Sequence, residues 1–167
     1  MTNLSKFLFL TGIAAAGQLA SAQPATYENF VLSIPQGAAL VDGEPTYYSD
    51  IRLESTIEGN FALTAADKNN LVTVDSVVAN VAESLPVQVS LTVAGAKSIP
   101  CVDLQPAAIF RNGFAFTVVL AETLLGPAES CIFIIDPFET TIALDVEGLD
   151  AGTYTVNVNG VEASFEL

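Results

Sequence analysis

The chain has 167 residues, 51% of them hydrophobic, and its 19 acidic residues against five basic ones give a formal net charge of −14 at pH 7. The hydrophobic content excludes a disordered chain, and the acidity argues against binding to nucleic acid or to an anionic membrane. Histidine is absent, which removes the commonest general base, the usual catalytic triads and most zinc sites, so we expect no enzymatic activity.

The first 22 residues have the pattern of a secretory signal peptide. Lys6 precedes an apolar run of about ten residues, "FLFLTGIAAA", which is shorter than the roughly 20 residues of a membrane span. Ala20 and Ala22 form a small-x-small motif that predicts cleavage after Ala22; a buried N-terminal helix is the alternative. We therefore expect a secreted or periplasmic protein without a membrane span, whose mature form keeps four basic and 19 acidic residues and a net charge of −15.

Residues 23–69 predict a short β segment. Three strands are expected in "YENFVLSI", "TYYSDIRLES" and "NFALTAA", separated by the turn signals "DGEP" and "EGN". Three strands are only marginally stable alone, so we expect them to pack on the rest of the chain. Tyr47 and Tyr48 are neighbours whose side chains must point to opposite sides of a strand, and an exposed tyrosine here could contact a sugar or a peptide. A tyrosine exposed without a role is the alternative.

Residues 70–167 predict a β-sandwich of seven or eight strands, because apolar residues recur at every second position. From this alternation we expect three rows of side chains to point into the core: Val87, Val89, Leu91 and Val93; Phe114, Phe116, Val118 and Leu120; and Ile142, Leu144 and Val146. The apolar segment "CIFIIDPF", residues 131–138, is expected to be a central strand, with a partner-binding edge as the alternative. The fold class expected is thus all-β, an antiparallel sandwich with an N-terminal three-strand segment.

The stretch "GLDAGTYTVNVNG", residues 148–160, has the features of a tyrosine corner followed by a strand and a tight turn. In that motif the hydroxyl of Tyr154 bonds to backbone upstream, while Val156 and Val158 face the core. These residues are accounted for by folding alone.

Cys101 and Cys131 are the two cysteines of the chain. In an oxidising compartment we expect them to form a disulfide that closes a loop of about 30 residues. A free thiol pair is an alternative, and a metal site is a poorer one because no histidine is present to complete it.

Four segments follow one another between about residue 77 and residue 167: "LPVQVSLTVAG", "NGFAFTVVL", "PFETTIALDVEGL" and the closing "AGTYTVNVNGVEASFEL", with one cysteine after the first segment and another after the second. In these segments and their order the chain resembles a family of uncharacterised secreted bacterial proteins. It implies an immunoglobulin-like sandwich with Cys101 bridged to Cys131, and nothing catalytic.

Carboxylates are densest in "DPFETTIALDVEGLD", and calcium is the metal ion that such oxygen ligands favour. No stretch matches the D-x-D-x-D-G calcium loop, and carboxylates on solvated strand edges and turns are the alternative. The candidate ligands are Asp136, Glu139, Asp145, Glu147 and Asp150.

The sequence as a whole predicts a non-catalytic binding or structural module that recognises an extracellular or periplasmic protein or glycan. Two other functions stay open: inhibition of a secreted hydrolase by a rigid loop at Ala121 to Ser130, and a calcium-dependent module.

Overall fold

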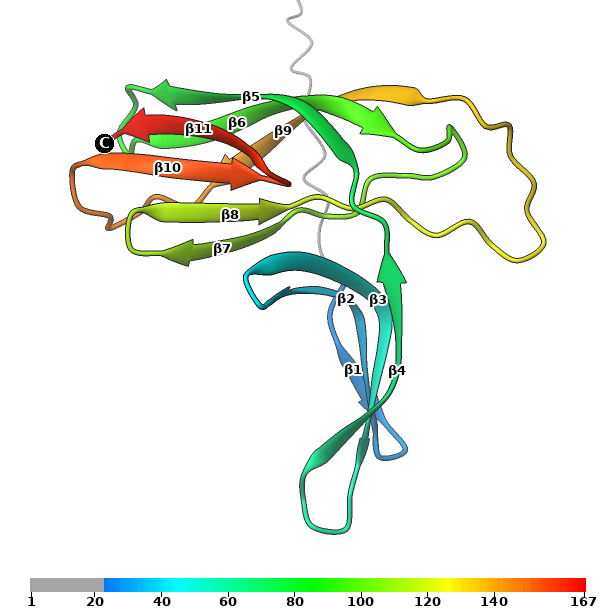
Figure 1. The fold of residues 1–167 in the computed structure, drawn as a ribbon. Coiled ribbons are helices and arrows are strands. Elements are labelled where there is room, and N and C mark those ends of the chain that lie inside the picture. The colour runs from blue at the N-terminus through cyan, green and yellow to red at the C-terminus, as the bar shows by residue number, and fades with distance from the viewer. Residues whose placement is uncertain (1–22) are drawn as a thin grey trace, which may run out of the picture.

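The computed structural model describes residues 23–167, so the predicted signal peptide lies outside the described residues. Every regular element in this part of the chain is a β-strand, and none of its segments is a helix able to cross a membrane. The strands form three sheets, of which one projects from the other two (Figure 1).

The projecting N-terminal sheet has the order β1-β2-β3-β4, with every neighbouring pair antiparallel. Its strands are β1 (Thr26–Glu28), β2 (Val31–Val41), β3 (Glu44–Ser55) and β4 (Phe61–Asn69). The sheet therefore has four strands where the sequence predicted three. The reason is local: Asn29 and Phe30 have φ angles of 51° and 67°, so "YENFVLSI" folds back on itself as a tight hairpin.

The remaining strands form a β-sandwich. One sheet has the order β5-β6-β9, from β5 (Thr73–Ala82), β6 (Gln88–Lys97) and β9 (Asp136–Leu144). The other has the order β11-β10-β8-β7, from β7 (Ala108–Asn112), β8 (Ala115–Val119), β10 (Thr153–Val158) and β11 (Val161–Glu166). The two sheets adjoin where β11 lies beside β5 (Figure 1).

The expectation of a wholly antiparallel sandwich is wrong for one pair of strands. β8 and β10 are parallel, with Thr155 opposite Ala115 and Val158 opposite Val118. The chain leaves β8, forms β9 in the other sheet and then returns, so it enters β10 from the same end as it entered β8. A connection of this length is what a parallel pair requires.

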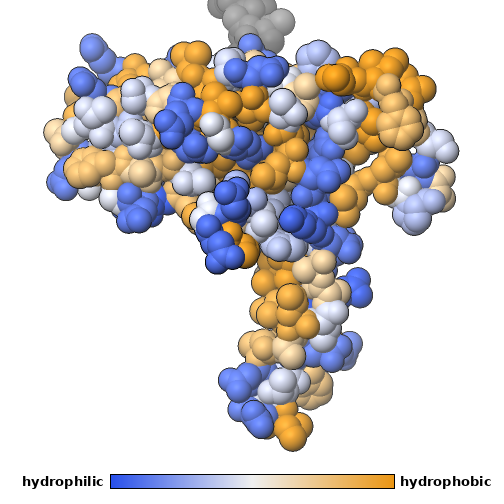
Figure 2. Space-filling view, viewed as in Figure 1, coloured by the Kyte–Doolittle hydropathy of each residue, from blue (hydrophilic) through white to orange (hydrophobic). Residues whose placement is uncertain are grey.

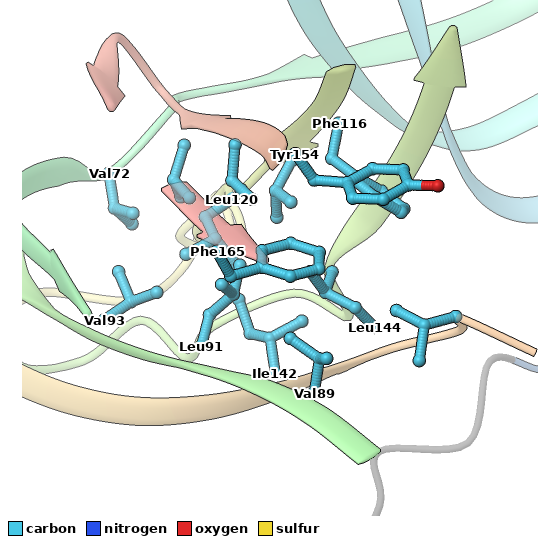
Figure 3. Packing of buried hydrophobic residues seen from close by; sticks show 14 residues of the cluster. Val72, Val89, Leu91, Val93, Phe116, Leu120, Ile142, Leu144, Tyr154 and Phe165 are labelled. Carbon is cyan, nitrogen blue, oxygen red and sulfur yellow. The ribbon is translucent and has the colours of Figure 1, made fainter. Parts of the chain in front are cut away.

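The core lies between the two sheets (Figure 3). Alternation predicted most of it correctly. Val89, Leu91 and Val93 on β6 are buried in one cluster with Phe116 and Val118 on β8 and with Ile142 and Leu144 on β9. Leu120 and Val146, just past the ends of β8 and β9, belong to the same cluster. For two residues the prediction of a core position is wrong. Val87 precedes β6 and is exposed, and Phe114 lies in the β7–β8 turn with 51% of its surface exposed, although its ring contacts Tyr154 at a centroid distance of 5.0 Å.

Candidate binding surface

The two halves of the described chain meet at Tyr47. Its side chain is 1% exposed and packs with Val119 and Ala121, and its hydroxyl donates to the carbonyl of Pro106 at 2.9 Å. Burial raises the pKa of the Tyr47 phenol above its ordinary value. Tyr48 is only half-buried, as the opposite orientation of neighbouring strand residues requires. Tyr47 therefore anchors the N-terminal sheet, and of the two residues only Tyr48 is left with surface for a contact.

Beside this anchor a pocket of about 670 Å³ lies between the N-terminal sheet and residues 123–127. Asp50 and Asp67 are the charged residues of its lining, which also includes Gln36, Ser49 and Gln105. Both carboxylates are exposed, so the pocket would favour a cation or a hydroxyl-rich group over an anion.

Glu122, on the sandwich side, also contributes to the contact between the N-terminal sheet and the sandwich. Its side chain is buried and accepts hydrogen bonds from the backbone N–H and the hydroxyl of Ser98. Its backbone carbonyl accepts from the amide of Asn69 at 3.0 Å, while the other side-chain atom of that amide, Oδ1, is buried without a hydrogen-bond partner among the described residues. Sequence reasoning missed Glu122 because nothing in "AETLL" separates a buried carboxylate from an exposed one.

Asn159 joins three segments of the sandwich. Its amide donates to the carbonyls of Val72 and Leu120, and its Oδ1 accepts from the backbone N–H of Leu120. The residue has φ of 47°, which asparagine tolerates. The "NG" signal predicted the turn, but these hydrogen bonds depend on segments up to 87 residues away and leave no local pattern.

The corner at Tyr154 has the expected local geometry. The buried Tyr154 donates from its hydroxyl to the carbonyl of Asp150 at 2.8 Å, and its ring stacks on Phe165 at a centroid distance of 5.3 Å. These contacts hold the start of β10 against the core, which is a structural role.

The five carboxylates proposed as calcium ligands are not brought together. Asp136 begins β9 and forms an ion pair with Lys97 at 2.9 Å. Asp145 lies just past the other end of the strand, where it accepts from the backbone N–H of Glu147, and Glu139 lies between them on β9. Nine residues of strand separate the two ends by roughly 30 Å. Within residues 23–167 no group of three or more acidic, cysteine or histidine side chains could hold a metal ion.

Cys101 and Cys131 form a disulfide, with their Cα atoms 6.0 Å apart. It ties the loop that follows β6 to the loop that precedes β9, at the end of the sandwich where both loops emerge (Figure 1). The expected Ala121–Ser130 loop also lies here. It starts buried at Ala121 and Glu122 and is exposed from Pro127 to Ser130.

The segment after Cys131 differs most from its prediction. "CIFIIDPF" was expected to be a central strand, but β9 begins only at Asp136, and Ile132, Phe133, Ile134 and Ile135 are exposed by 60% to 95%. The physical reason is the length of the partner strand. β6 ends at Lys97, which pairs with Asp136, so the residues before Asp136 extend past the last backbone partner.

These four residues form an apolar loop, Ile132–Ile135, at one end of the sandwich. Figure 2 shows apolar surface gathered at the end of the molecule where this segment lies. The loop is held on both sides, by the disulfide at Cys131 and by the ion pair of Asp136 with Lys97. Lys97 is itself fixed, because it also donates to the carbonyl of Val102 at 2.6 Å.

Residues 91–167 match the model of a family described as the ORF11 beta-sandwich domain. The match starts within β6 and continues through β11, and so agrees with a β-sandwich in the C-terminal part of the chain. Neither the curated proteins nor the solved structures include a match to this chain.

Proposed function

We propose that this protein is a secreted, non-catalytic binding module that holds another protein through the apolar loop Ile132–Ile135. The exposure of four consecutive large apolar side chains in a folded β-sandwich is the observation that carries the proposal. Such clusters on a soluble surface mark interaction sites, since water contact with them costs free energy that a partner recovers.

The energetics favour a small, well-anchored contact. Burying one side chain of this size yields about 1.5 to 3 kcal/mol, and one or two such anchors dominate many protein interfaces. Because the disulfide and the Lys97–Asp136 pair fix both ends of the loop, little conformational entropy is lost on binding. Phe133, exposed by 95%, is the best anchor of the four.

Secretion is part of the same proposal. The pattern of residues 1–22 and the pairing of both cysteines in a disulfide support export to an oxidising compartment, either the periplasm or the exterior. The hydrogen bond from Tyr154 to Asp150 supports a relation to immunoglobulin-like sandwiches, while the parallel β8–β10 pair departs from their strand pairing.

The test uses purified residues 23–167 as bait in the secreted and periplasmic fractions of the producing cell. Phe133→Asp should lower the recovery of a specific partner at least about tenfold, because it places a charge in the apolar contact. Ile57→Asp is the matched control: Ile57 is fully exposed in the turn between β3 and β4, and the partner should be recovered as with the wild type. Equal recovery by the wild type and Phe133→Asp would refute the role of the loop.

A second candidate is inhibition of a secreted hydrolase by the neighbouring Ala121–Ser130 loop. The observation favouring it is that this loop is held by hydrogen bonds. The N–H of Thr123 donates to the carbonyl of Asp103 outside the loop, and the N–H of Gly126 donates to the carboxylate of Glu129 within it. A panel of secreted proteases and lysozymes would decide, since a preorganised inhibitory loop should act at micromolar concentration. No inhibition at that level would remove this candidate.

A further inference from the structure

The outer half of the N-terminal sheet has one apolar face, which we call the distal face. Strand register places Tyr27, Leu32, Leu53 and Leu63 in one row across all four strands, and paired residues share a side of the sheet. The rows on either side add Ile34 with Ile51, and Phe61 opposite Ser55. The distal face consists of Tyr27, Leu32, Ile34, Ile51, Leu53, Phe61 and Leu63.

The two edges of the sheet curl toward each other on this side. Tyr27 is on β1 and Phe61 is on β4, at opposite edges, yet their ring centroids are 6.2 Å apart in an edge-to-face arrangement. This contact fixes the curvature of the sheet and makes the distal face a defined surface. It is therefore preorganised for packing.

Among the described residues no second layer packs on this face. The Tyr27–Phe61 contact spans it and its central residues Leu32 and Leu53 are half-buried, while its rim is open to solvent. Tyr27, Phe61 and Leu63 are 51% to 63% exposed, whereas Tyr47, nearer the sandwich on β3, is fully buried. Figure 2 shows apolar residues along the visible side of the projecting sheet. A sheet with an apolar face reaches a stable arrangement when a second layer packs on it.

The charges of this half of the sheet lie on its other face. Glu28, Val31 and Glu54 form a row there, next to the row of Ser33 and Arg52. Two distal faces could therefore meet without bringing like charges together, even though the whole chain carries a net charge of −14. A charged partner would find no complementary group on the distal face, so charge favours an apolar and uncharged occupant.

We propose that the distal face packs on the same face of a second copy of this chain, as a two-fold symmetric dimer of sheets. Two-fold dimers bring identical patches together, which suits a surface whose own composition is apolar and uncharged. The seven side chains offer about 500 Å² per protomer, or on the order of 1,000 Å² in total, which is the lower end for a specific interface. We expect a dimer with a dissociation constant in the micromolar range.

The experiment compares two lysine substitutions on the same edge strand by sedimentation equilibrium of residues 23–167. Leu63→Lys places a charge on the distal face, whereas Ala62→Lys places the same charge on the opposite face, across from Glu54. Both residues are exposed, so neither variant should unfold. The dissociation constant should rise at least about tenfold for Leu63→Lys and stay within about twofold for Ala62→Lys.

Salt provides an independent readout. Added salt screens the repulsion between two acidic protomers but leaves apolar contact intact, so the wild-type dimer should tighten between roughly 0.05 and 0.5 M salt. A wild-type protein that stays monomeric at about 100 µM, or equal weakening by Leu63→Lys and Ala62→Lys, would overturn the proposal. Neither result would bear on the Ile132–Ile135 loop, because that loop lies on the sandwich.

Discussion

The sandwich and the N-terminal sheet are built from similar strands, but the apolar side chains of the sandwich are mostly buried and those of the N-terminal sheet mostly are not. The sandwich strands supply most of the buried hydrophobic residues, whereas the N-terminal sheet supplies Tyr47 alone. Both regions alternate apolar and polar residues, and both have regular antiparallel hairpins. The difference is the second layer: the sandwich provides its own, while the N-terminal sheet touches the sandwich only at one end. Alternation thus determines which side of a strand is apolar, but whether that side is covered depends on the whole fold.

The largest effect that tests this comparison is expected from a matched pair of leucine truncations. Leu91→Ala, at a fully buried site in the sandwich, should lower the free energy of unfolding by about 3 to 5 kcal/mol. Leu53→Ala, on the half-covered N-terminal sheet, should lower it by less than about 1 kcal/mol, because the site is still partly hydrated. Denaturation in guanidinium chloride measures both values, at a protein concentration well below the micromolar dissociation constant expected for the dimer. Similar losses would mean that the distal face is covered within a single chain.

Asn159→Gly should have the next largest effect. Glycine keeps the positive φ of this turn but removes the side chain that satisfies the Leu120 N–H and the carbonyls of Val72 and Leu120. We expect a loss of about 2 to 3 kcal/mol, measured by chemical denaturation. The control is Asp42→Gly in the β2–β3 turn, where φ is also positive and the residue is exposed. This control should change stability by less than about 0.5 kcal/mol.

Tyr154→Phe tests the corner of the sandwich and should cost about 1 to 2 kcal/mol, because the bond from the hydroxyl to Asp150 is lost while the ring packing is kept. Thermal or chemical unfolding measures the change. A difference under about 0.3 kcal/mol would show that the hydrogen bond contributes nothing to the corner.

Tyr47→Phe is expected to have the smallest effect at neutral pH, about 0.5 to 1.5 kcal/mol, and it should act on the N-terminal sheet alone. The folded-state pKa of Tyr47 is raised, so its contribution is fully present below the unfolded-state value of about 10 and is lost as the pH rises through the folded pKa. The protection factor of the β3 amides, which is the exchange rate corrected for intrinsic base catalysis, should therefore fall above about pH 10 in the wild type. Tyr47→Phe should remove this fall in protection.

Much of the sandwich was predictable from its sequence. Leu91, Val118 and Val156 lie in long alternating runs, and the turn at Asn159–Gly160 has residues that tolerate positive φ. The parallel pairing of β8 with β10 was not predictable, because it depends on which sheet the intervening strand β9 joins.

The candidate binding loop was mispredicted for a similar reason. "CIFII" has the composition of a buried strand, yet its backbone lies beyond the end of β6. The length of β6 determines this, and no property of residues 131–135 reports it. The loop is therefore found only when exposure and strand pairing are considered together.

The bond from Asn159 to the carbonyl of Val72 has a practical consequence for anyone shortening the gene. Residues 91–167, the portion that matches a domain family, contain neither Val72 nor β5. Expressed alone, that fragment would leave one edge of β6 open, and such an edge invites aggregation. A truncation that folds autonomously should begin no later than Leu71.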